Sequence, residues 1–265
     1  MANAATLEVL RDYESRNVLF IEPDGSWPIV WERARGSHVW DANGKKYLDL
    51  TGAFGVAAAG HANAHVVKAG RQQMGRLLHA MGDVHPHAQK AALARELSRL
   101  TFERWPRRRH GAARARTIFC NSGFEAVEAA LKTAVLATGK REVIAFAGGY
   151  HGLGYGALNV THREFFRRPF QSQLGRFGKF VPFPQGRDTP LTGLEKQITR
   201  ILRQNRAGAI LVEPVQARGG IVVPPSGFLP MLRALCDRFG ALLIADEVYT
   251  GFGRTGKWFA CEHSE

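Results

Sequence analysis

The chain has 265 residues, of which 45% are hydrophobic and 22% charged, a balance typical of a soluble globular protein. No apolar run reaches the roughly 18 residues of a membrane span, and the N-terminus lacks the apolar core of a signal peptide. The three cysteines, Cys120, Cys236 and Cys261, are widely spaced, which predicts reduced thiols rather than disulfides or a metal site. We therefore expect a cytoplasmic protein with no membrane partner.

The net charge of +13 raises the possibility of a nucleic-acid partner. The arginines are spread along the chain, however, with dense clusters only at residues 107–110 and 163–168. This spread favours solvated arginine faces, so we expect no nucleic acid to bind. The alternative, a basic nucleic-acid-binding module, would bind DNA with a steep salt dependence.

The first part of the chain predicts a small antiparallel arm. Residues 29–50 alternate between apolar and polar side chains, and residues 41–44 (DANG) have the composition of a hairpin turn. A helix is expected at about residues 88–102, followed by a polar connection from Pro106 to Arg116.

The rest of the chain alternates short apolar runs with amphipathic runs. Buried strands are predicted at residues 116–120, 142–146, 209–213 and 241–245. Helical spacing of apolar residues predicts helices around residues 127–135, 191–202 and 228–239. Strands separated by helices in this way imply an α/β fold with a mostly parallel sheet and flanking helices.

The last of these helices carries its own boundary signals. Ser226 is expected to cap it, Pro230 to lie in its first turn and Gly240 to end it.

Polar and glycine residues gather after the predicted strands, where ligands bind in open α/β sheets. Asn121, Ser122 and Gly123 open a helix, whose free N–H groups can hold a phosphate. An ordinary helix cap explains the same residues. Tyr150 and His151 lie in a glycine-rich loop, where Tyr150 can stack on a flat ring or simply face solvent.

Asp246 follows a predicted buried strand, where a carboxylate needs a cationic partner. A protonated pyridine nitrogen is one such partner, and the ring then acts as an electron sink. An ion pair with Arg254 is an alternative. A metal site is disfavoured because no histidine stands at ligand spacing from Asp246 in the sequence.

The motifs NSGFEAVEAALK, GGYHG, EPVQARGG and DEVYTGFGRTG occur in this order, after the arm PIVWERARGSHVWDANGKKYLDLTGAFGVAAAGH. Together they resemble class III pyridoxal-phosphate-dependent aminotransferases, the group that includes ω-amino acid transaminases. The resemblance extends from about Trp27 to His263.

The resemblance implies an arm at residues 1–60 that is part of a small domain. Residues 61–265 would then form the large domain of a type I pyridoxal-phosphate transferase. It implies amino group transfer from an amine or amino acid to a 2-oxo acid, and a homodimer when full length. Decarboxylases and isomerases share this scaffold, so the reaction stays open at this point.

Roles for individual residues also come from the resemblance. Ser122 and the N–H groups of Gly123 and Phe124 would hold the cofactor phosphate, and Asp246 would pair with the ring nitrogen. The ring would lie between Tyr150 and Val248. Glu213 and His151 would lie beside the cofactor, and Glu247 would support the strand end.

The sequence departs from the family pattern at several positions. Phe124 stands where a small hydroxyl residue is usual, Tyr249 where glutamine is common, and Leu153 where several members that use ω-amino acids with a carboxylate have an arginine. The Schiff-base lysine of the family is expected beyond Glu265, and Lys257 does not match its position. A truncated, inactive cofactor-binding remnant is therefore the alternative to an active transaminase.

Overall fold

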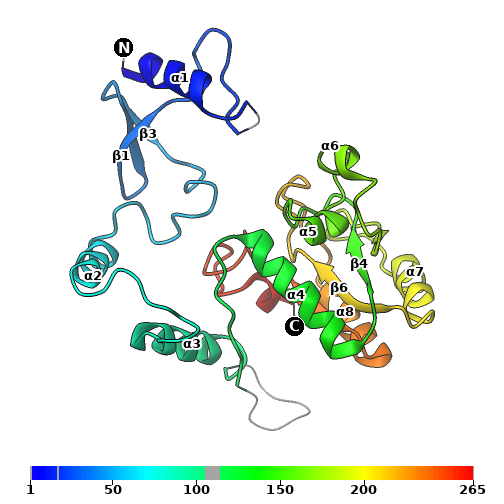
Figure 1. The fold of residues 1–265 in the computed structure, drawn as a ribbon. Helices are drawn as coiled ribbons and strands as arrows, with labels where there is room; N and C mark the ends of the chain where they lie inside the picture. Colours follow the sequence, from blue (N-terminus) through cyan, green and yellow to red (C-terminus); the bar gives the residue numbers. More distant parts are fainter. Residues whose placement is uncertain (1, 17, 105–113, 265) are drawn as a thin grey trace. The chain divides into compact units, whose positions relative to one another are not determined.

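The computed structural model describes residues 2–16, 18–104 and 114–264, which divide into two compact units, Met1–Ala88 and Gln89–Glu265 (Figure 1). The predicted boundary after residue 60 falls within the first unit, and the assignment of residues 1–60 to a small domain stays a prediction. The basic cluster at 107–110 and most of the connection from Pro106 lie outside the described residues.

The first unit contains the expected antiparallel arm. Its sheet has the order β1 (Trp31–Arg35), β2 (His38–Asp41) and β3 (Lys46–Leu48), with antiparallel pairing throughout. The predicted turn joins β2 to β3, and Gly44 adopts φ +84 there, a left-handed conformation that suits glycine. The described residues of this unit also form the helices α1 (Ala2–Tyr13) and α2 (Ala64–Met74).

The second unit is built on a parallel sheet. Its strands are β4 (Glu142–Phe146), β5 (Gly178–Val181), β6 (Ala207–Val212) and β7 (Leu242–Ala245), in the order β5-β4-β6-β7. Each neighbouring pair is parallel. The predicted fold class, an α/β sheet with flanking helices and a small antiparallel arm, is confirmed.

Helices cover both faces of this sheet (Figure 1). On one face, Ile144 and Ile210 pack with α7 (Thr192–Leu202) and α8 (Phe228–Phe239). On the other face, Val143 and Leu211 pack with α4 (Gly123–Thr138) and α5 (Tyr155–Val160). Neighbouring residues of one strand face opposite sides, so strands apolar at every position are buried on both faces.

The remaining elements of this unit are short or lie outside the sheet. They are α3 (Ala88–Leu100), α6 (Glu164–Arg167) and the 3₁₀ turns η1 (Arg168–Phe170) and η2 (Ala260–His263). The helix expected at 88–102 is therefore confirmed as α3. Among the described residues, no helix is long and apolar enough to cross a membrane.

Some predictions of elements were wrong. Residues 116–120 form no strand, and Ile118 and Phe119 are exposed, because no strand among the described residues pairs with this segment. The strand at 241–245 is not buried, because β7 pairs only with β6 and lies at the edge of the sheet that the structure describes. The short strand β5 was not predicted.

The boundaries of α8 were predicted in part. Gly240 ends the helix in a left-handed conformation at φ +61, and Pro230 lies in the first turn, as expected. Ser226 is not the cap, because Gly227 occupies the N-cap position and no side chain caps the helix there.

Candidate functional site

Two buried side chains meet at the carboxyl ends of the parallel strands. Asp246 follows β7, and its Oδ2 lies 2.7 Å from Nδ1 of His151, which follows β4. Both side chains are almost fully buried, with 6% and 1% exposed. This distance suits a hydrogen bond in which the imidazole Nδ1 donates and the carboxylate Oδ2 accepts.

The second oxygen of Asp246 is also held. Its Oδ1 accepts a hydrogen bond of 3.1 Å from the backbone N–H of Val248. The loop that carries His151 is fixed in turn by Thr161, whose Oγ1 accepts from the His151 N–H and donates to the Gly152 carbonyl. The orientation of Asp246 is therefore set by both β4 and β7.

Glu213 lies directly after β6 and joins the same region. Its Oε2 accepts from the N–H of Tyr150 at 3.1 Å, and its Oε1 accepts from the N–H of Ala217. Burial, and to a smaller extent the nearby Asp246 carboxylate, raise the pKa of Glu213, whereas the nearby His151 and the two amide donors lower it. The net pKa is raised, because burial destabilises the charged carboxylate more than its hydrogen-bond partners stabilise it.

The N-terminus of α4 packs against the residues that follow β7. A Cβ added at Gly123 would lie 3.3 Å from both methyl carbons of Val248, so glycine allows this close approach. Ser122 occupies the N-cap position, and its hydroxyl accepts from the Glu125 N–H. The N–H groups of Gly123 and Phe124 precede Glu125 in the first turn of α4. They make no hydrogen bond to any described residue, because the first N–H groups of a helix have no partner within it.

Phe124 packs against the glycine-rich loop after β4. A Cβ added at Gly152 would lie 2.3 Å from that of Phe124, and one added at Gly154 would lie 2.6 Å from its ring. Glycine at these two positions therefore leaves room for the aromatic side chain of Phe124. Phe124 itself remains 40% exposed.

Tyr150 is positioned by two neighbours. The ring of Phe166 meets it edge-on at a centroid distance of 5.7 Å, and the guanidinium of Arg218 lies over it at 4.4 Å. The structure thus brings together all the residues that the sequence predicts for the site: Ser122, Gly123, Phe124, Tyr150, His151, Glu213, Asp246 and Val248. Whether they bind a cofactor stays a prediction.

Three contributors were missed by the sequence analysis. Thr161 orders the loop after β4, Gln216 donates through Nε2 to the Ala147 carbonyl, and Arg218 lies over Tyr150. His151 contacts Asp246 although the two residues lie 95 positions apart in the sequence, so sequence spacing did not indicate this pair. No group of three or more potential metal ligands occurs within the described ranges.

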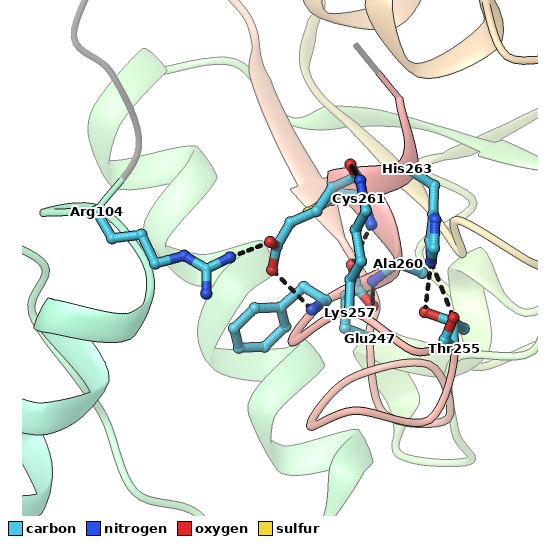
Figure 2. Close-up of polar contacts among 9 residues, drawn as sticks. Arg104, Glu247, Thr255, Lys257, Ala260, Cys261 and His263 are labelled. Carbon is cyan, nitrogen blue, oxygen red and sulfur yellow. Dashed lines mark hydrogen bonds and ion pairs between the residues drawn. The ribbon is translucent and has the colours of Figure 1, made fainter.

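Glu247 and Lys257 belong to the segment that follows the site (Figure 2). The carboxylate of Glu247 accepts from the N–H groups of Ala260 and Cys261, and so holds η2 against the end of β7. Lys257 Nζ donates to the Glu262 carbonyl at 2.7 Å. Glu247 therefore supports the strand end, as expected, and Lys257 is engaged in the local turn.

Known proteins resemble this chain in both sequence and structure. The family model Aminotransferase class-III matches residues 21–265. The acetylornithine aminotransferase of Archaeoglobus fulgidus is 39% identical over 235 residues, covering 89% of this chain and 56% of that protein. The acetylornithine aminotransferase of Methanosarcina mazei is 37% identical and covers 95% of this chain and 58% of its own length.

Among solved structures, an amine transaminase from an uncultivated Pseudomonas species, in its PLP-bound form, has a TM-score of 0.77 and 30% identity. It covers 93% of this chain and 58% of its own. A transaminase from Bacillus megaterium has a TM-score of 0.84 and 26% identity, over 98% and 59% of the two chains.

The chain thus spans somewhat more than half the length of the curated relatives it matches. The family match covers nearly the whole sequence, and the folds agree over nearly all of it. The chain belongs to the class-III aminotransferase family.

Proposed function

We propose that this chain forms the cofactor-binding part of an aminotransferase. The whole enzyme would move an amino group from an amine or amino acid to a 2-oxo acid. Pyridoxal phosphate is the cofactor that the family match indicates. The single observation that carries the proposal is the convergence of Asp246, His151, Glu213 and Tyr150 beside the N-terminus of α4.

The residues present fit such a cofactor at both of its charged ends. The free N–H groups of Gly123 and Phe124, at the positive end of the α4 dipole, suit a phosphate. Asp246 is buried and has a carboxylate charge that suits a protonated ring nitrogen. When bound, pyridoxal phosphate supplies a ring that withdraws electrons from the bonds around the amino-bearing carbon.

The protein's own contribution is then mainly one of position and charge. Asp246 would hold the proton on the ring nitrogen, and His151 Nδ1 and the Val248 N–H would keep its carboxylate aimed. Tyr150 would stack on one ring face and Val248, which is 62% exposed, would pack on the other. Glu213 would order the Tyr150 backbone through its N–H.

Features of the whole enzyme belong to the same proposal. Residues 1–60 would be part of a small domain, and the full-length protein would be a cytoplasmic homodimer with small-molecule substrates. The free thiols of Cys120, Cys236 and Cys261 agree with a reducing compartment.

The test is a titration of the chain with pyridoxal phosphate, followed by absorbance, with inorganic phosphate as competitor. We expect saturable binding that phosphate weakens, and a loss of about tenfold or more in Asp246→Asn, which removes a buried charge partner. Asp237→Asn is the matched control, because Asp237 is an exposed carboxylate on α8 that pairs with Arg233.

Binding and turnover are separate readouts. Amino transfer from an amine donor to 2-oxoglutarate by the full-length enzyme would support the whole proposal. Cofactor binding without any transfer would favour the inactive remnant. A chain that binds no pyridoxal phosphate, or an Asp246→Asn variant that binds it as well as wild type, would contradict the assignment of the site.

A further inference from the structure

Arg218 is a partly buried cation beside the proposed site, and the proposed function gives it no role. Its guanidinium carbon lies 4.4 Å from the centroid of the Tyr150 ring, a distance typical of a cation–π contact. Tyr150 is a residue we place against the cofactor ring. A group bound by Arg218 would therefore lie beside Tyr150.

The loop that presents Arg218 is tightly closed. Gln216 and Val222 exchange two backbone hydrogen bonds across its base, of 3.1 and 2.9 Å. Side chains tie the loop to its surroundings, because Glu213 accepts from the Ala217 N–H and Gln216 Nε2 donates to the Ala147 carbonyl. Such anchoring holds an arginine in place before a ligand arrives, which reduces the entropy lost on binding.

The charge around Arg218 is not balanced by an acid. Within the described residues, no carboxylate lies within ion-pair distance of Arg218. Arg163 adds a second guanidinium, whose Nη2 donates to the Arg218 carbonyl. The nearby carboxylates are engaged elsewhere, Glu213 by backbone N–H groups and Asp246 by His151. An anionic ligand group would complete this arrangement.

We propose that Arg218 binds the carboxylate of the amino donor or of the 2-oxo acid beside Tyr150, and so selects carboxylate-bearing substrates. This inference rests on the proposed function. Leu153 in the loop after β4 is apolar and 50% exposed, so the guanidinium beside Tyr150 comes from Arg218, in the loop after β6. The planar guanidinium can donate two parallel hydrogen bonds to one carboxylate.

Two stable probes that differ only in a carboxylate test the inference. One is the reduced adduct of pyridoxal phosphate with alanine, and the other is the reduced adduct with ethylamine. Wild type is expected to bind the alanine adduct more tightly. Arg218→Gln should bind it about tenfold to a hundredfold less tightly, the usual range for a charge-assisted hydrogen bond, while its affinity for the ethylamine adduct stays unchanged.

Arg218→Lys keeps the charge but not the two parallel donors, so it should recover part of the difference. The matched control is Arg238→Gln, because Arg238 makes a similar contact with Phe239 on α8, at 5.2 Å from the ring centroid. It should bind both adducts as wild type does.

The outcomes separate the two proposals. If wild type binds both adducts equally, or if Arg218→Gln weakens both equally, Arg218 only supports Tyr150 and the inference is overturned while cofactor binding stands. If wild type binds neither adduct nor pyridoxal phosphate, the proposed function is overturned with it.

Discussion

At the residue scale, Glu213 is a buried carboxylate whose surroundings disfavour its charge. Burial raises its pKa above the ordinary value of 4.5, in spite of two amide donors and the nearby His151. The native chain then holds this proton more tightly than the unfolded chain does. Stability must fall as pH rises from about 4.5 through the raised pKa, because the charged form is penalised only in the native state.

Glu213→Gln should remove this dependence. Urea unfolding between about pH 4 and pH 8 is expected to show wild type losing stability relative to the variant as pH rises. The N–H groups of Tyr150 and Ala217 bond to different oxygens of Glu213, and glutamine has only one side-chain oxygen. The variant therefore has a lower free energy of unfolding by an amount that does not depend on pH. Glu195→Gln, at an exposed position on α7, serves as the control, and parallel curves for wild type and Glu213→Gln would contradict the prediction.

The site residues were predictable to the extent that a local pattern carried them. Ser122 and Gly123 open a helix, and Asp246 ends a strand, so sequence alone could indicate them. The His151 contact with Asp246 and the Arg218 contact with Tyr150 depend on which strand ends become neighbours in the sheet. No short-range spacing encodes such contacts, and this is why they were missed.

At the element scale, the core on one face of the sheet is centred on three aromatic rings. Phe228 of α8 lies 5.3 Å from both Phe146 and Phe183, and the latter two lie 5.8 Å apart, all edge-on. Phe228 is completely buried. Edge-to-face contacts of this kind add to the free energy gained by burial.

We expect Phe228→Ala to lower the free energy of unfolding by about 3–5 kcal/mol, because it leaves a cavity that the two remaining rings cannot fill. Phe165→Ala, at a position 84% exposed, should change it by less than about 0.5 kcal/mol. Denaturant unfolding of both variants measures the difference. Equal effects would show that this aromatic cluster does not anchor α8.

The strand predictions were most accurate for the strands that pair with a neighbouring strand on each side. β4 and β6 each pair on both sides and are buried at every position, so their apolar runs were clear. Residues 116–120 contain a shorter apolar run, at 118–120, and have no partner strand in the part of the chain that the structure describes. β5 (GKFV) was missed because a glycine and a lysine interrupt a run of only four residues.

At the scale of the whole molecule, large apolar side chains remain widely exposed. Leu50 and Leu136 are each 87% exposed, Val56 is 84% exposed and Ile118 is 69% exposed. Scattered apolar residues are normal on a protein surface, but this many exposed large apolar side chains favour association with another protein chain. The net charge of +13 acts in the opposite direction, because like charges repel.

These two properties predict an unusual salt dependence of self-association. Raising the salt from about 0.1 M to about 1 M shortens the Debye length from about 10 Å to about 3 Å, so the repulsion fades while apolar contacts remain. Sedimentation velocity should therefore show a larger dimeric or higher fraction at high salt, in line with the proposed homodimer. Any retention of DNA should fall over the same range, since phosphate contacts release counterions.

A single monomeric boundary at every salt concentration would argue against self-association of this chain. Association that weakens with salt would instead mean that charge pairs drive it, and that the exposed apolar side chains do not.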